Sequence, residues 1–145
     1  MAAIWVLTAD GAKARLFAAD APTGALQELE TFANPEGRAK QRELKTDRPG
    51  ATSPRMGRGR RATEPDVSPH EHALQQFAKL LVDYLEAGRT GNDFERLALV
   101  AAPAFLGMLR DQMSAPLKSL VSLELDKDFV ALDAGELRPR LPERL

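Results

Sequence analysis

The residues whose types and spacing best suit chemistry form a short run of arginines and glycines at residues 54–65. The run reads Pro-Arg-Met-Gly-Arg-Gly-Arg-Arg-Ala-Thr-Glu-Pro, and its candidate binding residues are Arg55, Gly57, Arg58, Gly59, Arg60 and Arg61. Arginine keeps its charge at any accessible pH, so such a run is not buried in a core. Glycine adopts positive φ at little steric cost and lets the backbone approach a ligand closely. The run therefore predicts an exposed loop that binds phosphates or an RNA backbone.

Five further basic residues precede this run, namely Arg38, Lys40, Arg42, Lys45 and Arg48. Residues 36–61 hold nine Lys or Arg against three acids, which gives this segment a charge of +6, although the whole chain carries −1. Charge concentrated in one segment directs an anionic partner to one place, so we expect these residues to extend the same binding surface. No aromatic residue is interleaved with them, so stacking on unpaired bases is not indicated. The alternative is a solvated linker.

Three aspartates are the candidates for hydrolytic chemistry. Asp10, Asp126 and Asp128 each follow a segment that is expected to be a strand. A nuclease would need such carboxylates clustered around two Mg²⁺ ions. The alternative assigns Asp10 to a hairpin turn, and the other two to a cap or a surface ion pair.

Two histidines flank Glu71 at the expected start of a long helix. Positions i and i+2 of a helix lie about 200° apart, so His70 and His72 do not readily ligate one metal. The chain has no cysteine, which excludes disulfides and thiolate metal sites. It also lacks a Gly-x-Ser-x-Gly elbow and a phosphate-binding P-loop motif. We expect no cofactor and no bound metal.

The amino-acid composition limits the classes of protein to which this chain can belong. The 145 residues are 43% hydrophobic and 28% charged, which suits one domain over residues 1–145 with a real core. No apolar run approaches the roughly 18–20 residues that span a bilayer. The first residues lack the basic region of a signal peptide. We therefore expect a soluble, cytoplasmic protein without a membrane partner.

The elements that must position the basic run follow from periodicity and turn signals. Strands are expected at 3–8, 13–19 and 26–32, with an Asp-Gly turn between the first two. Asn34 can cap a short helix through 38–44, and a long basic loop is expected at about 46–67. Ser68 then starts a helix whose apolar stripe runs from Leu74 to Leu85, and Gly88 is expected to end it.

Helices and strands alternate in the rest of the chain. A strand at 97–101, a helix from Pro103, a strand at 123–125 and a short helix after Asp133 are expected. Tyr84 is expected in or near the core, and Gly107 is expected to allow close helix packing. This order predicts an α/β fold with a mixed sheet of about five strands, an antiparallel meander followed by parallel strands, and helices on its faces.

Four blocks of sequence resemble the bacterial host attachment protein family. They are Ile-Trp-Val-Leu-Thr-Ala-Asp at 4–10 with Ala-Arg-Leu-Phe at 14–17, Glu-Pro at 64–65 with Pro-His-Glu-His at 69–72 and Phe-Ala at 77–78, the stretch 97–110, and Leu-Glu-Leu-Asp-Lys-Asp at 123–128. That family in turn resembles the middle domain of archaeal and eukaryotic class-one peptide-chain release factors and of Pelota. The resemblance covers nearly the whole chain.

The resemblance implies an RNase H-like fold. In release factors, a loop of this domain carries a Gly-Gly-Gln motif that hydrolyses peptidyl-tRNA. The basic run lies in the corresponding place, just before the long helix, but its glycines are separated by Arg58 and it contains no glutamine. The hydrolytic residues therefore do not transfer.

These observations lead to one expected function and two alternatives. We expect a translation-associated RNA-binding protein that contacts ribosomal RNA or tRNA through the Arg/Gly loop, in ribosome rescue or dormancy. The first alternative is a nucleic-acid or peptidyl-tRNA hydrolase. The second alternative is a protein-interaction module for attachment to host cells.

Overall fold

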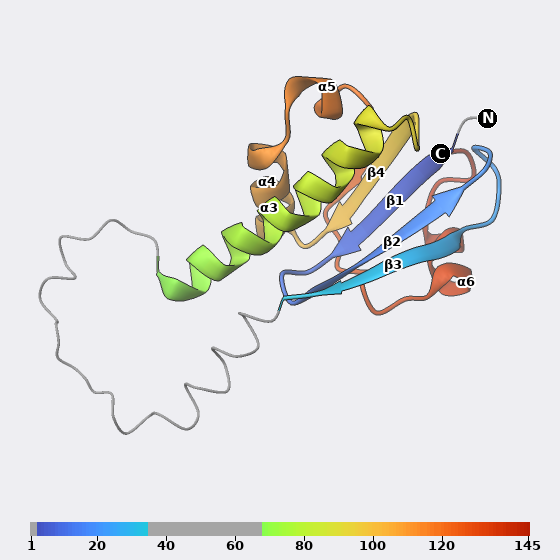
Figure 1. The fold of residues 1–145 in the computed structure, drawn as a ribbon. Helices are drawn as coiled ribbons and strands as arrows, with labels where there is room; N and C mark the ends of the chain where they lie inside the picture. The colour runs from blue at the N-terminus through green and yellow to red at the C-terminus, as the bar shows by residue number, and fades with distance from the viewer. Residues whose placement is uncertain (1–2, 35–67) are drawn as a thin grey trace, which may run out of the picture.

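The structure is a computed structural model that describes residues 3–34 and 68–145. The short helix expected at 38–44 and the basic loop expected at about 46–67 lie outside the described residues, so both stay predictions. The described elements build a five-stranded sheet in the order β3-β2-β1-β4-β5 (Figure 1).

The first three strands form the expected antiparallel meander. They are β1 Ile4–Ala9, β2 Lys13–Ala19 and β3 Gln27–Ala33. β1 pairs with β2 across the Asp-Gly turn, and a register shift between Leu16 and Phe17 marks a bulge in the β2–β3 pair. The bounds of β2 coincide with the prediction, while β1 and β3 each lie one residue further along the chain.

The last two strands extend the sheet in parallel. β4 spans Arg96–Ala101 beside β1, and β5 spans Val121–Leu125 beside β4. The predicted α/β class with a mixed sheet is therefore confirmed. A meander of three strands followed by two parallel strands, with the first strand in the centre, is the RNase H-like arrangement that was expected.

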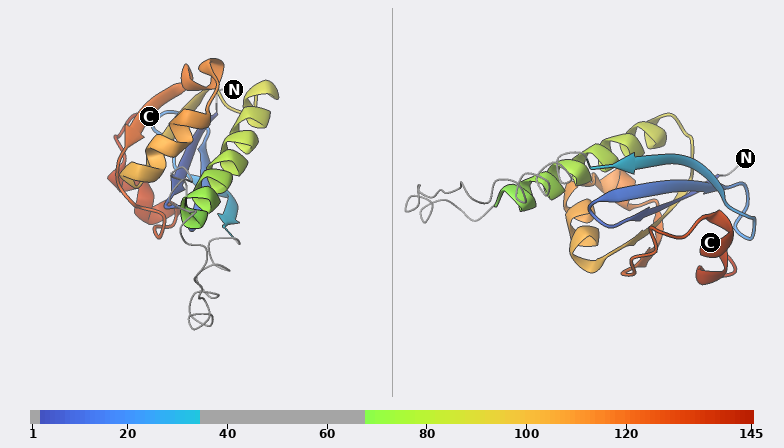
Figure 2. Two further views of the ribbon diagram at one scale, coloured as in Figure 1. Left: turned by 90° about the vertical axis from the view of Figure 1, so that its left-hand side faces the viewer. Right: turned by 90° about the horizontal axis from the view of Figure 1, so that it is seen from below.

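Helices α3 Pro69–Thr90, α4 Pro103–Gln112 and α5 Ala115–Lys118 lie on one face of the sheet. The opposite face carries α6 Ala134–Leu137 and the 3₁₀ helix η1 Arg138–Arg140. Figure 2 shows the green α3 and the red α6 on opposite sides of the strands. We call the two sides the helical face and the C-terminal face.

Each face has its own apolar core, and β4 contributes to both. Its Leu97 and Leu99 pack with Leu81, Leu85 and other residues of the helical face. Ala98 and Val100 pack with Leu137 on the C-terminal face. A strand that is covered on both sides has no polar alternation, which explains the continuous apolar run of β4.

Gly88 does not end α3, contrary to the sequence-based prediction. The helix continues to Thr90, and Gly91 is its C-cap residue. A Cβ atom on Gly88 would lie 2.6 Å from the Trp5 ring and 3.0 Å from Phe94. Gly88 is therefore needed where the helix meets an aromatic pair, and its effect on helix propensity is outweighed by this packing.

The expectation about Gly107 is wrong. Gly107 has open space where a Cβ would be, so close helix contact does not explain this glycine. Tyr84 lies at the edge of the core and not inside it: it is 39% exposed on the flank of α3, and its ring centroid is 6.1 Å from that of the buried Trp5. Among the described residues, no helix is both long and apolar enough to cross a membrane.

Candidate functional site at the anchor end of the sheet

The candidate site is the end of the sheet at which residues 35–67 leave and rejoin the described fold. We call it the anchor end and define it by Asp10, Gly11, Asn34, Ser68 and Ala73. β1 and β4 both finish here, since Ala9 pairs with Ala101 in parallel register. Ligands of open α/β sheets bind outside the carboxyl ends of such strands.

Asp10 and Gly11 form the turn between β1 and β2. The Oδ1 atom of Asp10 accepts hydrogen bonds from the backbone N–H groups of Ala12 and Lys13, at 2.8 and 3.0 Å. Gly11 has φ of 93°, and a Cβ there would lie 2.8 Å from the side chain of Leu74 in α3. The turn thus needs glycine for its backbone angle and for the close approach of α3.

Asn34 fastens the end of β3 to this turn and to α3. Its side chain is almost fully buried. Its backbone N–H donates to the carbonyl of Ala12 at 2.8 Å, and its Nδ2 donates to the carbonyls of Gly11 and Ala73 at 3.0 and 3.4 Å. A buried amide with several partners holds a chain in one position.

Ser68 fixes the other end of the undescribed segment, and the predicted helix start is confirmed. Its Oγ accepts a hydrogen bond from the N–H of Glu71 at 3.0 Å, and Pro69 follows in the first turn. This is the N-cap arrangement that satisfies an otherwise unpaired helix donor. Because Asn34 also contacts Ala73 in α3, the segment leaves and rejoins the fold at neighbouring points.

The predicted RNA-binding residues all belong to the segment between these two anchors. They are Arg38, Lys40, Arg42, Lys45, Arg48, Arg55, Gly57, Arg58, Gly59, Arg60 and Arg61, and they lie outside the described residues. What the structure does describe is the frame that carries the segment.

Two of the three candidate hydrolytic residues have structural partners, and the third, Asp126, is exposed directly after β5. Asp10 serves the hairpin turn, and Oδ1 of Asp128 accepts a hydrogen bond from the N–H of Val130 at 3.4 Å. Within residues 3–34 and 68–145, no three His, Asp or Glu side chains come together in a group able to hold a metal ion. His72 is exposed, and its ring lies 3.3 Å from the amide of Gln76. The described residues therefore contain no carboxylate cluster of the kind that a two-metal nuclease would need.

The sequence did not predict an ion pair that lies on the C-terminal face. Arg15 in β2 donates to both carboxylate oxygens of Glu28 in β3, at 3.0 and 2.9 Å, and Thr31 donates to the same carboxylate. The hydrogen bond from Arg15 lowers the pKa of Glu28 against the opposing effect of burial. Arg15 also donates to the carbonyl of Val130, so the pair links the meander to the C-terminal segment.

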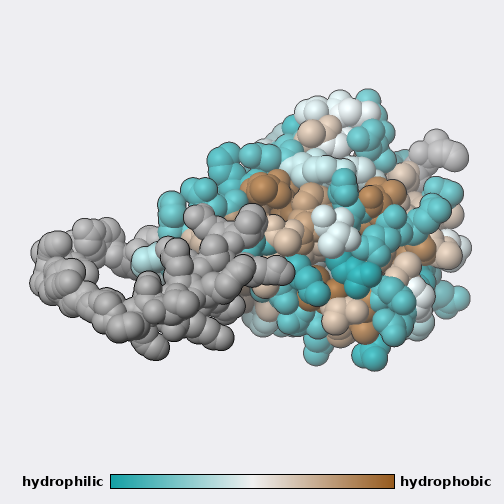
Figure 3. Space-filling view, turned by 60° about the horizontal axis from the view of Figure 1, so that its bottom comes forward, coloured by the Kyte–Doolittle hydropathy of each residue, from teal (hydrophilic) through white to brown (hydrophobic). Residues whose placement is uncertain are grey.

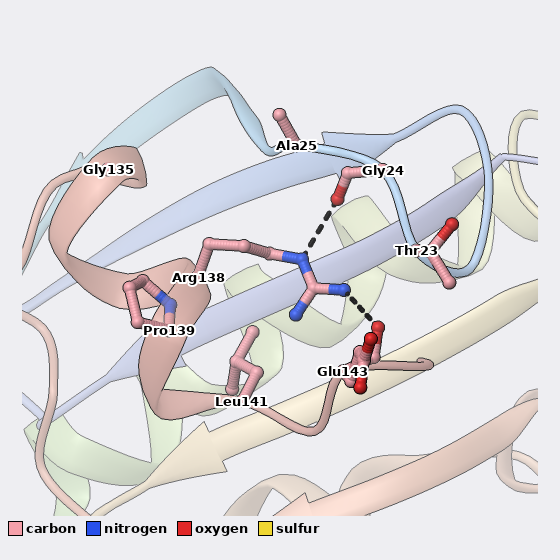
Figure 4. A pocket seen from close by; sticks show the side chains of 8 residues that line it. All are labelled: Thr23, Gly24, Ala25, Gly135, Arg138, Pro139, Leu141 and Glu143. Carbon is pink, nitrogen blue, oxygen red and sulfur yellow. Dashed lines mark hydrogen bonds between the residues drawn. The ribbon is translucent and has the colours of Figure 1, made fainter.

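Arg138 lines a cavity of about 680 Å³ at the other end of the sheet (Figure 4). Its guanidinium donates to four carbonyl oxygens, those of Pro22, Gly24, Pro142 and Glu143, at 3.2, 2.9, 2.8 and 2.8 Å. These bonds occupy most of its five donors. The residue is thus a structural clamp, and the neighbouring sequence contains no signal of this role.

Glu86 plays a similar part on the helical face. Its carboxylate accepts hydrogen bonds from the N–H and the hydroxyl of Ser114, and from Arg89. Burial acts to raise the pKa of Glu86, but the hydrogen bonds from Ser114 and Arg89 outweigh it and lower the pKa. The carboxylate thereby ties α3 to the N-cap of α5.

Comparisons with known proteins give a family. A curated relative, "Uncharacterized protein RP470" of Rickettsia prowazekii (strain Madrid E), is 30% identical over 69 residues, which are 46% of this chain and 46% of the relative. The match thus spans about half the length of that protein. The crystal structure of the Ppx/GppA phosphatase of Aquifex aeolicus (type II variant) is similar with 14% identity and a TM-score of 0.45, over 86% of this chain and 35% of the phosphatase.

The family match extends over all five strands. The sequence model of the family described as "Protein required for attachment to host cells" matches residues 5–141. The further resemblance to release factors and Pelota stays a prediction. The extent of the match shows that this chain belongs to the family of proteins required for attachment to host cells.

Proposed function

We propose that this chain contributes to attachment to host cells as a protein-interaction module. The observation that carries the proposal is the family match over residues 5–141. Among the described residues, Asp10, Glu86 and Arg138 serve a turn, a helix cap and a clamp, and no three His, Asp or Glu side chains form a group that could hold a metal ion. A module of this kind acts by binding.

The partner is proposed to be an acidic protein surface that binds the segment 35–67. This segment holds nine of the twenty Lys and Arg residues of the chain and has a net charge of +4, while the remaining residues are net acidic. Asn34 and Ser68 hold its two ends on a rigid frame. A local basic patch accelerates association with an acidic partner and disfavours basic ones.

The test compares bacterial adhesion with two triple variants. We expect Arg58→Gln with Arg60→Gln and Arg61→Gln to reduce the number of adherent cells severalfold without loss of the folded protein. The matched control is Lys79→Gln with Lys127→Gln and Arg144→Gln, which removes the same charge from the body of the domain. Equal adhesion by wild type and the segment variant would contradict the proposed role of the segment.

A second candidate is contact with ribosomal RNA or tRNA in the cytoplasm, which is favoured by the arginines and glycines of the same segment. Each phosphate that is neutralised releases counterions, so such binding weakens steeply with salt. We expect co-sedimentation with ribosomes at low salt, its loss at high salt, and its loss in the segment variant but not in the control variant. Co-sedimentation that is equal for both variants would argue against RNA contact by the segment.

A further inference from the structure

The face of the molecule that Figure 3 shows carries its hydrophobic surface in separate patches, with hydrophilic residues between them. Scattered apolar residues are ordinary on protein surfaces and identify no partner. The cavity beside Arg138 is different, because several segments of the chain build it. Its volume of about 680 Å³ lies within the roughly 300–1,000 Å³ that is typical of ligand pockets.

The lining of this cavity combines apolar walls with one guanidinium group. Three segments contribute to it: residues 23–25 between β2 and β3, the short helices α6 and η1, and the tail that follows them (Figure 4). The walls include Ala25, Pro139 and Leu141. Arg138 lies between these segments. A ligand of this cavity would therefore contact both apolar surface and the guanidinium.

The guanidinium of Arg138 has little capacity left for hydrogen bonds. Four of its five N–H donors bind the carbonyl oxygens of Pro22, Gly24, Pro142 and Glu143. An oxyanion binds a guanidinium best through two parallel hydrogen bonds along its edge, and one remaining donor cannot supply them. The flat faces of the group do not need these donors. Figure 4 shows one of these faces, with the three nitrogens spread around the central carbon.

Two other arginines on the C-terminal face already lie over an aromatic ring of this chain. Arg15 lies over Phe17 and Arg140 over Phe129, with 5.8 and 5.6 Å to the ring centroids. Among the described residues, no ring lies over Arg138 in this way. A guanidinium attracts the negative face of an aromatic ring, and that of tryptophan most strongly. An aromatic ring is thus the ligand that suits the remaining face of Arg138.

Glu143 adds a hydrogen-bond acceptor to the same cavity. Its side chain lines the cavity and is exposed, and it has no ion pair within the described part of the chain. The bond from Arg138 goes to the backbone carbonyl of Glu143 and leaves the carboxylate available. An indole offers what both groups bind, since it has a large π face and one N–H donor at its edge.

We propose that the cavity beside Arg138 binds an indole ring, with the ring face on the guanidinium of Arg138 and the ring N–H donating to the carboxylate of Glu143. The proposed source of the ring is a tryptophan side chain of a partner protein, because tryptophan is enriched among the residues that dominate protein interfaces. The cavity lies at the end of the sheet away from Asn34 and Ser68. The proposal therefore does not depend on the proposed function.

Binding of N-acetyl-tryptophan amide to the full chain, followed by NMR, tests the proposal. We expect saturable shifts that are largest at Gly24, Ala25 and Gly135, and about tenfold weaker binding of N-acetyl-leucine amide, which has no π face. Ala25→Phe places a ring at the cavity itself and should abolish binding, while Gln27→Phe adds a ring outside the cavity and should not. No saturable binding, equal binding of the leucine amide, or full binding by Ala25→Phe would overturn the proposal.

Two further measurements test the stacking and the hydrogen bond separately. Fluorine on the indole ring withdraws electrons from its face, so a fluorinated tryptophan amide should bind more weakly than the parent compound. Glu143→Leu keeps the backbone carbonyl that Arg138 binds, and it should weaken binding of the tryptophan amide severalfold but not that of N-acetyl-phenylalanine amide, whose ring has no N–H. Unchanged affinities in these two measurements would overturn the assigned geometry. Tighter binding of free tryptophan than of its blocked amide would overturn the protein side chain as the source of the ring.

Discussion

The two faces of the sheet are covered in different ways. On the helical face, α3 and α4 bury a continuous apolar core that includes Phe77, Leu81 and Phe105. Of the described residues, two short helical segments lie on the C-terminal face, where arginines fasten the chain by bonds to backbone carbonyls. Arg15 bonds Val130, Arg96 bonds Leu145 at 2.6 Å, and Arg138 bonds four carbonyls.

The difference teaches that one sheet can combine two modes of stabilisation. The stability gained from apolar burial is shared by many residues, because each side chain touches many others. The stability gained from a guanidinium clamp depends on one residue, because a single side chain satisfies several carbonyls at once. We therefore expect substitutions on the helical face to act on the whole fold, and those on the C-terminal face to loosen one segment.

The largest effect should come from the helical face. Phe77→Ala removes a buried ring that stacks on Phe105 with 5.9 Å between centroids. The free energy of unfolding should fall by about 3–5 kcal/mol, as is typical of large aromatic truncations in a core. Urea unfolding followed by circular dichroism measures this loss. A loss below about 1 kcal/mol would show that the helical face is not the dominant core.

A smaller effect is expected from the equivalent truncation on the C-terminal face. Leu137→Ala removes the buried side chain that α6 places against Ala98 and Val100. The expected cost is about 2–4 kcal/mol. Amide exchange should rise most between residues 126 and 145, with little change in α3. Uniform loss of protection over both faces would mean that the two layers unfold as one unit and would break the comparison.

The clamp itself is tested by Arg138→Lys. Lysine keeps the charge but lacks the planar fork that reaches Gly24 on one side and Glu143 on the other. We expect a loss of about 1–3 kcal/mol from unpaired carbonyls, again with faster exchange in the C-terminal segment. Arg140→Lys is the control, because Arg140 lies over the ring of Phe129 and clamps no carbonyl by a described bond. Equal effects of the two substitutions would remove the special role of Arg138.

The smallest expected effect is on the stability of the fold at acidic pH. Glu28 and Glu86 both have a lowered pKa, so each stabilises the fold above its unfolded-state pKa, and this stabilisation is lost as the pH falls through the folded-state pKa. In the wild type, the free energy of unfolding falls as this acidic range is entered. Glu28→Gln and Glu86→Gln should each make that fall smaller, by about 1 kcal/mol or less. Thermal melts between neutral and acid pH measure the slope. Unchanged slopes in both variants would contradict the lowered pKa values.

Local sequence signals predicted most of the fold. Ser68 and Pro69 indicate the start of α3, and the Asp10-Gly11 pair indicates the first hairpin, because caps and turns depend on adjacent residues. The unbroken apolar run of β4 likewise predicted cover on both faces. Such features need no knowledge of distant contacts.

The errors and omissions depend on residues far apart in sequence. Gly88 resembled a helix end, yet its role depends on Trp5, which the sheet brings beneath it. The bonds of Asn34 to Gly11 and Ala73 had no signal in the sequence, while the helix that Asn34 was expected to cap lies outside the described residues. Nothing in the sequence near Arg138 shows that Pro22 and Gly24 lie opposite it. The candidate binding residues between 35 and 67 stay predictions, because the structure describes only their anchors.

The anchoring by Asn34 and Ser68 has a consequence for how this domain can vary. The entropic cost of closing a loop rises only with the logarithm of its length, and here the folded body already sets the closing points. Longer, shorter or unrelated inserts at this position should therefore leave the melting temperature of the body nearly unchanged. We therefore expect the junction to be a permissive graft site, at which residues 35–67 can be replaced without redesigning the scaffold.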